Sequence, residues 1–171
     1  MSTTQRQDKL GDGVSTLVDL SAIDLSATLA TREQMFELIH HRHEMALLDR
    51  VIWANEDNTQ GVGSVVVRGD EFWVRGHFPS KPMFPGVLMV EAGAQLSCYL
   101  YNRYFGQLHL AAFIRIENAA FRRSVTVGEE MLVLCKGEKV SPRRFITRVE
   151  GVVDGQICFE AKIVGMRIEE G

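Results

Sequence analysis

The sequence predicts an α+β fold in which an antiparallel sheet of about six strands wraps around one long central helix. Residues 86–102 are apolar on all sides when placed on a helix, which is typical of a helix buried on most of its surface. The second half of the chain alternates between β-rich segments and short turns. Because tight turns join neighbouring strands of opposite direction, these segments favour an antiparallel sheet.

The length of 171 residues suits one domain with a substantial core, and the contents of 46% hydrophobic and 24% charged residues are ordinary for a globular protein. The net charge of -3 gives no reason to expect nucleic acid or an acidic membrane surface as a partner. The longest weakly charged run is too short and too polar for a membrane-spanning helix. Cys98, Cys135 and Cys158 lack metal-ligand spacing and lie in apolar runs, so we expect reduced core thiols in a cytoplasmic protein.

The chain begins with a segment of different character. Residues 1–31 are rich in Ser, Thr, Asp and Ala, and we expect a flexible N-terminal arm with one short helical segment near residues 17–25. Thr31 and Gln34 have the spacing of a capping box, which predicts the start of a short helix. We therefore expect the folded domain to occupy residues 32–171.

The remaining elements follow from local turn chemistry. The dipeptide Asp154-Gly155 is a strong signal for a two-residue hairpin, and three of the four prolines lie in a loop before the long helix. Pro85 suits the first position of that helix, where its missing N–H costs nothing. The expected strands are residues 45–54, 63–68, 110–116 interrupted before 119–121, 131–140, 145–153 and 157–168.

His77 and Glu91 are the leading candidates for acid–base chemistry. Glu91 is the only charged residue of the predicted helix, and a lone carboxylate in an apolar helix is costly unless it is paired or protonated. A buried, hydrogen-bonded structural carboxylate is the alternative explanation. His77 lies just upstream in the proline-stiffened loop, so a histidine, a carboxylate and a helix N-terminus converge within a short stretch.

Gly86 provides a third group, because the free N–H groups at a helix N-terminus can polarise a carbonyl and glycine leaves room for close approach. A thioester carbonyl on the Gly86 N–H would have a more acidic α-proton. A neutral His77 could take that proton, and a protonated Glu91 could donate one to a departing β-hydroxyl. The three groups predict a β-elimination site.

The histidines His40, His41 and His43 form a cluster, but no carboxylate or cysteine pattern completes a ligand set around them. We therefore expect no metal.

These residues resemble the 3-hydroxyacyl-(acyl-carrier-protein) dehydratases of type II fatty acid synthesis, which have a hot-dog fold. The resemblance spans about residues 33–168. Its matching segments are His41-Arg42 with Leu48-Asp49-Arg50-Val51, Gly76-His77-Phe78-Pro79 with Lys81-Pro82, Pro85-Gly86-Val87-Leu88, Glu91-Ala92 with Ala94-Gln95, Phe121-Arg122-Arg123 with Val125, and Val127-Gly128-Glu129.

The resemblance implies dehydration of (3R)-3-hydroxyacyl thioesters on acyl carrier protein to trans-2-enoyl thioesters, without a cofactor or metal. It places the catalytic pair on His77 and Glu91 and the carbonyl-polarising amide on Gly86. It also implies that the Met83 carbonyl orients the histidine and that Gln95 supports the acid. It further implies a homodimer, with a trimer of dimers left open, in which His77 of one protomer faces Glu91 of the other.

A glutamate at position 91 resembles the branch of the family that only dehydrates. The chain departs from the family at His43-Glu44-Met45, where an aromatic-Pro-Phe sequence is usual, and at Ser80, where glycine is usual. The arm of about thirty residues is also extra, and these departures leave the acyl chain length and pathway open.

Four arginines are candidates for docking the acidic carrier protein: Arg143 and Arg144 at a hairpin turn, and Arg122 and Arg123 after a strand. Solvated surface charge is the alternative for all four. Two other functions also remain open for the chain, namely a hot-dog acyl thioesterase and a non-catalytic acyl-binding subunit.

Overall fold

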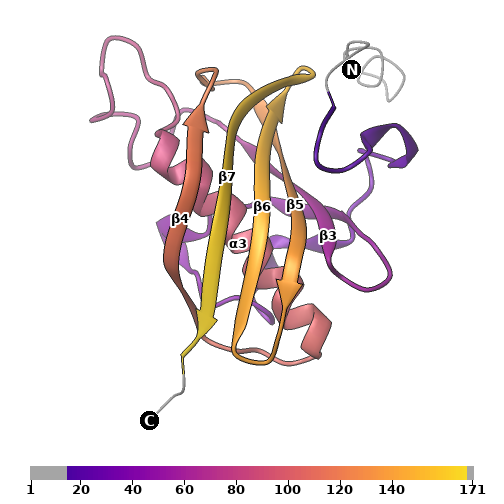
Figure 1. The fold of residues 1–171 in the computed structure, drawn as a ribbon. Helices are drawn as coiled ribbons and strands as arrows, with labels where there is room; N and C mark the ends of the chain where they lie inside the picture. Colours follow the sequence, from indigo (N-terminus) through magenta and orange to yellow (C-terminus); the bar gives the residue numbers. More distant parts are fainter. Residues whose placement is uncertain (1–14, 169–171) are drawn as a thin grey trace.

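The computed structural model describes residues 15–168, which form one curved sheet wrapped around one long helix (Figure 1). The strands are β1 (Ala30–Thr31), β2 (Arg50–Ala54), β3 (Gln60–Val66), β4 (Ala111–Phe121), β5 (Glu130–Val140), β6 (Arg144–Val153) and β7 (Gln156–Arg167). The helices are η1 (Leu20–Ala22), α2 (Arg32–Met35), η2 (His43–Met45) and α3 (Gly86–Phe105).

The sheet has the order β1-β2-β3-β5-β6-β7-β4, and every neighbouring pair is antiparallel. The predicted α+β architecture is therefore confirmed. The sheet has seven strands rather than about six because the two-residue β1 pairs with β2. A strand so short carries no hydrophobic periodicity that a sequence pattern could reveal.

The central helix α3 is buried along most of its length, as its apolar sequence predicts. It begins at Gly86 after Pro85 and ends at Gly106, whose φ of 63° gives the left-handed C-cap that glycine adopts readily. Its close fit against β6 depends on Gly93, because a Cβ there would lie 2.9 Å from Cβ of Val149. The last helical residue is Phe105, so the helix extends three residues beyond the predicted end at residue 102.

The predicted turns determine how the strands connect. Asp154 and Gly155 have φ angles of 48° and 75°, which matches the two positive φ values of a type I′ hairpin turn. The expected interruption in β4 is a register shift between Glu117 and Ala120, with Asn118 at a φ of 53°. Thr31 and Gln34 form the predicted capping box at the start of α2.

One expected strand is wrong at its start. The segment of residues 45–54 begins as the 3-10 helix η2, and only Arg50–Ala54 pairs in the sheet. The backbone N–H of Leu47 donates to the side-chain oxygen of Gln95 on α3 rather than to a neighbouring strand. This long-range contact takes the Leu47 N–H away from the ladder, whereas the N–H of Asp49 already donates to the Ser64 carbonyl of β3.

Residues 15–31 differ from the expected flexible arm, because they pack on the sheet face that points away from α3 (Figure 1). Their buried side chains are Val18, Leu20, Ile23 and Leu25, and these contact Ile52, Val62, Leu134 and Val152. Arg50 fixes the end of the segment by donating to the carbonyl oxygens of Leu25, Ser26 and Ala27. Residues 1–14, which complete the predicted arm, lie outside the described residues.

No helix among residues 15–168 is both long and apolar enough to cross a membrane. The three cysteines are buried free thiols, as expected.

Candidate active site

The loop between β3 and α3 carries His77 on a buried aromatic anchor. Trp73 is buried, and its ring packs 5.5 Å from the ring of Phe84, measured between centroids. The carbonyl oxygen of Trp73 accepts hydrogen bonds from the backbone N–H groups of His77, at 2.7 Å, and of Gly76, at 3.1 Å. The backbone at His77 is therefore tied to the core even though the loop has no regular secondary structure.

The imidazole of His77 is oriented by the backbone at Met83. Its Nδ1 atom lies 2.8 Å from the Met83 carbonyl oxygen, and Met83 in turn bridges to Thr126. Because a carbonyl oxygen only accepts, the neutral ring places its proton on Nδ1 and its free lone pair on Nε2. This geometry agrees with the role that the family resemblance implies for Met83.

Gly86 occupies the first position of α3, where the leading N–H groups of a helix have no intrahelical acceptor. The ring of Phe121, at the end of β4, lies so close that a Cβ on Gly86 would come within 2.7 Å of it. Glycine is therefore required for this packing. Phe121 is about half exposed, so this end of the helix opens to the surface beside an aromatic ring.

Glu91 lies on α3 and is held by two side chains. Its Oε1 atom accepts a hydrogen bond of 2.9 Å from Nε2 of Gln95 and lies 3.2 Å from Nε2 of His41. Gln95 is fully buried, and it also donates to the Met45 carbonyl and accepts from the N–H of Leu47. The side chain predicted to support the acid does contact it, through a saturated hydrogen-bond network.

The negative charge of Glu91 also affects a neighbouring thiol. Burial, and after it the charge of Glu91, raise the pKa of Cys98 to about 12. Cys98 is therefore a protonated, inert thiol beside the carboxylate.

His41 is the residue of this site that sequence reasoning missed. The sequence shows it as one of three clustered histidines and as part of the His41-Arg42 segment, with no role assigned, whereas the structure distinguishes it from the other histidines by its contact with Glu91. Among residues 15–168, no group of three or more His, Cys, Asp or Glu side chains has an arrangement that could hold a metal ion. The His41-Arg42 motif in the family resemblance was the available signal for a role at the site.

Within the described part of one chain, the two candidate catalytic side chains, His77 and Glu91, do not contact each other. Among the described residues, no hydrogen bond or ion pair links His77 to Glu91, since the first contacts Met83 and the second contacts His41 and Gln95. Each half of the predicted acid–base pair is thus positioned by its own set of contacts.

The four candidate docking arginines lie at two separate places. Arg122 follows Phe121 directly and so lies at the Gly86 end of α3, and it pairs with Glu160, while Arg123 pairs with Glu129. Arg143 and Arg144 follow a turn whose Ser141 and Pro142 carbonyls accept from the hydroxyl of Tyr101. Tyr101 lies fifteen residues after Gly86 on α3, a distance of about 22 Å along the axis at the rise of an α-helix.

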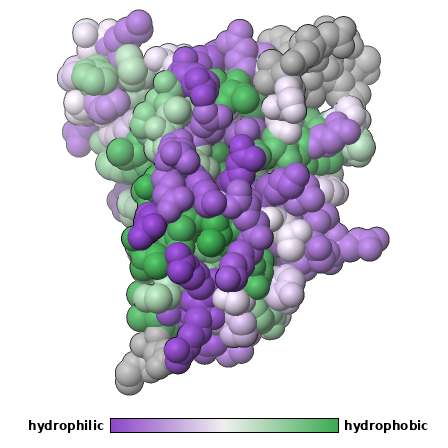
Figure 2. Space-filling model, viewed as in Figure 1, coloured by the Kyte–Doolittle hydropathy of each residue, from purple (hydrophilic) through white to green (hydrophobic). Residues whose placement is uncertain are grey.

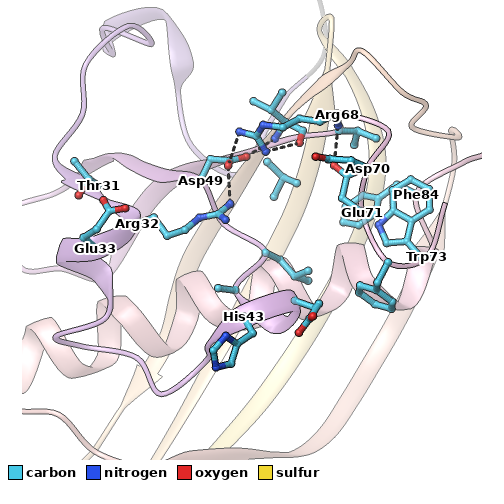
Figure 3. A pocket seen from close by; sticks show the side chains of 17 residues that line it. Thr31, Arg32, Glu33, His43, Asp49, Arg68, Asp70, Glu71, Trp73 and Phe84 are labelled. Carbon is cyan, nitrogen blue, oxygen red and sulfur yellow. Dashed lines mark hydrogen bonds and ion pairs between the residues drawn. The ribbon is translucent and has the colours of Figure 1, made fainter.

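A pocket of about 590 Å³ lies between the loop that carries His77 and the segment around Leu47, whose N–H bonds to Gln95 (Figure 3). Trp73 and Phe84 form one end of it, and Ala46 and Leu47 form part of its wall. At another side, Asp49 accepts from both Arg32, at 2.6 Å, and Arg68, at 2.7 Å. One carboxylate thus faces two guanidinium groups on this side, while the apolar end formed by Trp73 and Phe84 adjoins the His77 loop.

Comparison with known proteins places this arrangement in a family. The model of the FabA-like domain matches residues 39–162. The 3-hydroxyacyl-(acyl-carrier-protein) dehydratase FabZ of Erwinia tasmaniensis is 40% identical over 144 residues, which cover 81% of this chain and 93% of that protein. The FabZ of Agrobacterium fabrum is 34% identical over 154 residues, which cover 88% of this chain and 99% of that protein.

Solved structures share the fold at low identity. The dehydratase heterocomplex ApeI:P from Xenorhabdus doucetiae matches with a TM-score of 0.66 and 14% identity, covering 80% of this chain and 91% of that chain. The TT0310 protein from Thermus thermophilus matches with a TM-score of 0.57 and 17% identity, covering 76% and 100%. At such identities the structures show the fold alone, whereas the sequence relatives show the family. The chain therefore belongs to the FabZ family of 3-hydroxyacyl-(acyl-carrier-protein) dehydratases.

Proposed function

We propose that this protein dehydrates (3R)-3-hydroxyacyl thioesters on acyl carrier protein to trans-2-enoyl thioesters. The observation that carries the proposal is the contact between His77 and the Met83 carbonyl, which leaves Nε2 as a free base. Membership of the FabZ family supports the reaction and the carrier, since the relatives are named for this activity. We propose that residues 32–171 carry this activity.

The proposed mechanism is an acid–base elimination. The N–H of Gly86 donates to the thioester carbonyl oxygen and stabilises the negative charge that develops there. Nε2 of His77 takes the α-proton, and the electrons of that C–H bond form the new double bond. Glu91 gives a proton to the β-oxygen, which leaves as water with the electrons of the C–O bond.

We further propose that a homodimer completes the site, with His77 of one protomer facing Glu91 of its partner. Two observations support it. The two residues do not contact each other within the described chain, and β4 is an edge strand of eleven residues. Ile114 and Ile116 of β4 are about half exposed, and Figure 2 shows apolar surface along this side of the sheet. A long apolar edge strand is a ready template for pairing with a second chain. A trimer of dimers remains a prediction.

We also propose that the carrier protein docks at Arg122 and Arg123 rather than at Arg143 and Arg144. The first pair lies at the Gly86 end of α3, where the thioester must reach. The side chain of Arg122 is 55% exposed, so it can meet an acidic partner despite its ion pair with Glu160. We propose a cytoplasmic location, which suits the three free cysteines.

The direct test is an assay of hydration and dehydration with acyl thioesters of several lengths, on both acyl carrier protein and coenzyme A. His77→Ala and Glu91→Gln should each lower turnover by about a hundredfold or more. Near-normal dehydratase activity in both variants would show that the proposed mechanism is wrong. Release of free thiol would instead identify a thioesterase, and ligand binding without conversion would identify an acyl-binding subunit.

A further inference from the structure

The carboxylate of Glu91 is held asymmetrically. Both Nε2 of His41, at 3.2 Å, and Nε2 of Gln95, at 2.9 Å, contact the same oxygen, Oε1. Within residues 15–168, no hydrogen bond or ion pair engages the other oxygen, Oε2. The carboxylate is about one-fifth exposed, so one oxygen is fixed by the protein and the other is available to a substrate.

His41 is held in place by its neighbour Arg42. The guanidinium of Arg42 donates to the carbonyl oxygens of Ile39, at 2.7 Å, of His41, at 2.9 Å, and of Phe36, at 2.9 Å. The same guanidinium lies 4.4 Å over the ring of Phe36, and Ile39 is buried in the core. The guanidinium of Arg42 therefore ties the backbone at His41 to the preceding turn, which limits the positions that the imidazole can take.

The other ring nitrogen of His41 determines its protonation. Nδ1 is buried and has no hydrogen-bond partner. A cationic ring would place an unpaired N–H donor at that buried position, and leaving such a donor unpaired costs free energy. A neutral ring with its proton on Nε2 leaves only a lone pair at Nδ1 and places its hydrogen on the nitrogen that lies 3.2 Å from Oε1 of Glu91.

We infer that His41 is a positioning residue for Glu91, and that its neutral Nε2–H form and Gln95 together hold Oε1, so that Oε2 carries the proton delivered to the substrate. The inference rests on the proposed acid role of Glu91. Oε1 accepts the hydrogen bond from Gln95 and lies 3.2 Å from Nε2 of His41, so it is the poorer place for the acid's proton, which we place on Oε2.

The contacts to Oε1 affect catalysis because Glu91 changes from a neutral acid to a charged carboxylate during the reaction. As the C–O bond breaks, Oε2 gives its proton to the leaving oxygen, and water departs with the bonding electrons. His77 has meanwhile taken the α-proton. Because Glu91 has given its own proton to the leaving oxygen, it ends the step as a carboxylate. Hydrogen bonds to a charged acceptor are stronger than those to a neutral one. The N–H groups of His41 and Gln95 thus stabilise the transition state more than the starting acid.

The test compares three variants in the full-length enzyme. His41→Phe fills a similar volume without a donor, and it should lower kcat by about tenfold, the effect of one charge-assisted hydrogen bond, with little change in KM. His41→Gln restores an N–H donor and should recover most of that loss. His40→Ala changes an exposed histidine next in the chain and is the matched control. Equal activity of the Phe and Gln variants would contradict the inference.

The pH profile separates positioning from a merely structural role. The titratable groups facing Glu91 are His41 from the segment before η2, Cys98 from α3, and in the proposed dimer His77 of the partner. If the proposed acid limits the rate at high pH, removing the His41 contact with its carboxylate should move the basic limb of the pH–rate profile upward in His41→Phe. An unmoved limb would argue against any action through Glu91.

Two further measurements keep the inference separate from the proposed function. In a Glu91→Gln background, adding His41→Phe should cost nothing more, because both act through one group. Full additivity there would overturn the inference, whereas normal activity of Glu91→Gln alone would overturn the proposed function. Nitrogen NMR on the unmodified protein should show His41 as the neutral Nε2–H tautomer, and a cationic ring or an Nδ1–H tautomer would refute it.

Discussion

The Nδ1 atom of His77 lies 2.8 Å from the backbone carbonyl oxygen of Met83, and this contact assigns the two ring nitrogens different roles. We predict that the neutral His77 ring carries its proton on Nδ1, which is opposite to the Nε2–H form inferred for His41. Histidine nitrogen shifts in the labelled protein measure both tautomers at once. Loss of one set of signals in His77→Ala provides the assignment, and an Nε2–H form of His77 would refute the base assignment.

Gly86 and Phe121 should be energetically coupled. A Cβ on Gly86 would lie 2.7 Å from the Phe121 ring, so Gly86→Ala forces that ring aside. We expect Gly86→Ala to be less favourable in the unmodified protein than in a Phe121→Ala background, by about 1 kcal/mol of unfolding free energy. Urea unfolding of the two single variants and the double variant measures the difference. Independent effects would mean that the ring does not pack on Gly86.

The two arginine pairs should differ in their effect on carrier-bound substrate. We predict that Arg122→Glu raises KM for an acyl-carrier-protein substrate by about tenfold and leaves KM for a small acyl thioester nearly unchanged. Arg143→Glu, at the other end of α3, is the matched control. The effect should weaken as salt is added, because the attraction is screened. A larger effect at Arg143 would move the docking site to that turn.

The packed part of the N-terminal segment should contribute to stability. Ile23 is buried against the outer face of the sheet, so Ile23→Ala should lower the free energy of unfolding by about 2 kcal/mol. Leu29→Ala, at a side chain that is 39% exposed in the same segment, should cost less than about 1 kcal/mol. Urea denaturation at fixed pH gives both values, and equal small losses would indicate that the segment is detached in solution.

Glu150 should make stability depend on pH. This side chain is buried on β6, and burial raises its pKa, while a hydrogen bond from the N–H of Leu17 opposes the shift. A carboxyl whose folded-state pKa exceeds the unfolded value binds more protons when folded, so its contribution to stability falls as pH rises. The loss begins near the unfolded value of about 4.3 and is complete above the raised pKa.

Glu150→Gln should remove this dependence while keeping an oxygen that accepts from Leu17. Unfolding free energies of the two proteins, measured from pH 4 to pH 8, should diverge as pH rises, with the variant gaining relative to the original. Parallel curves would show that Glu150 remains solvated in the folded protein.

Local chemistry explains which parts of the fold could be predicted. Thr31 with Gln34, the Asp154-Gly155 turn and the apolar run beginning at Gly86 each act over a few residues. Their conformations are therefore largely independent of the rest of the chain. The start of β2 was wrong for the opposite reason, because Gln95 captures the Leu47 N–H from a distant helix.

The sequence by itself determined the antiparallel sheet around one helix, the candidates His77, Gly86 and Glu91, and their likeness to the dehydratase family, since periodicity, turn residues and motifs are local properties. Only the tertiary structure decided that His41 contacts Glu91, that Phe121 covers Gly86 and that residues 15–31 pack on the sheet. Each of these contacts joins segments far apart in the chain. Such contacts depend on how the sheet curves around α3, which no short stretch of residues specifies.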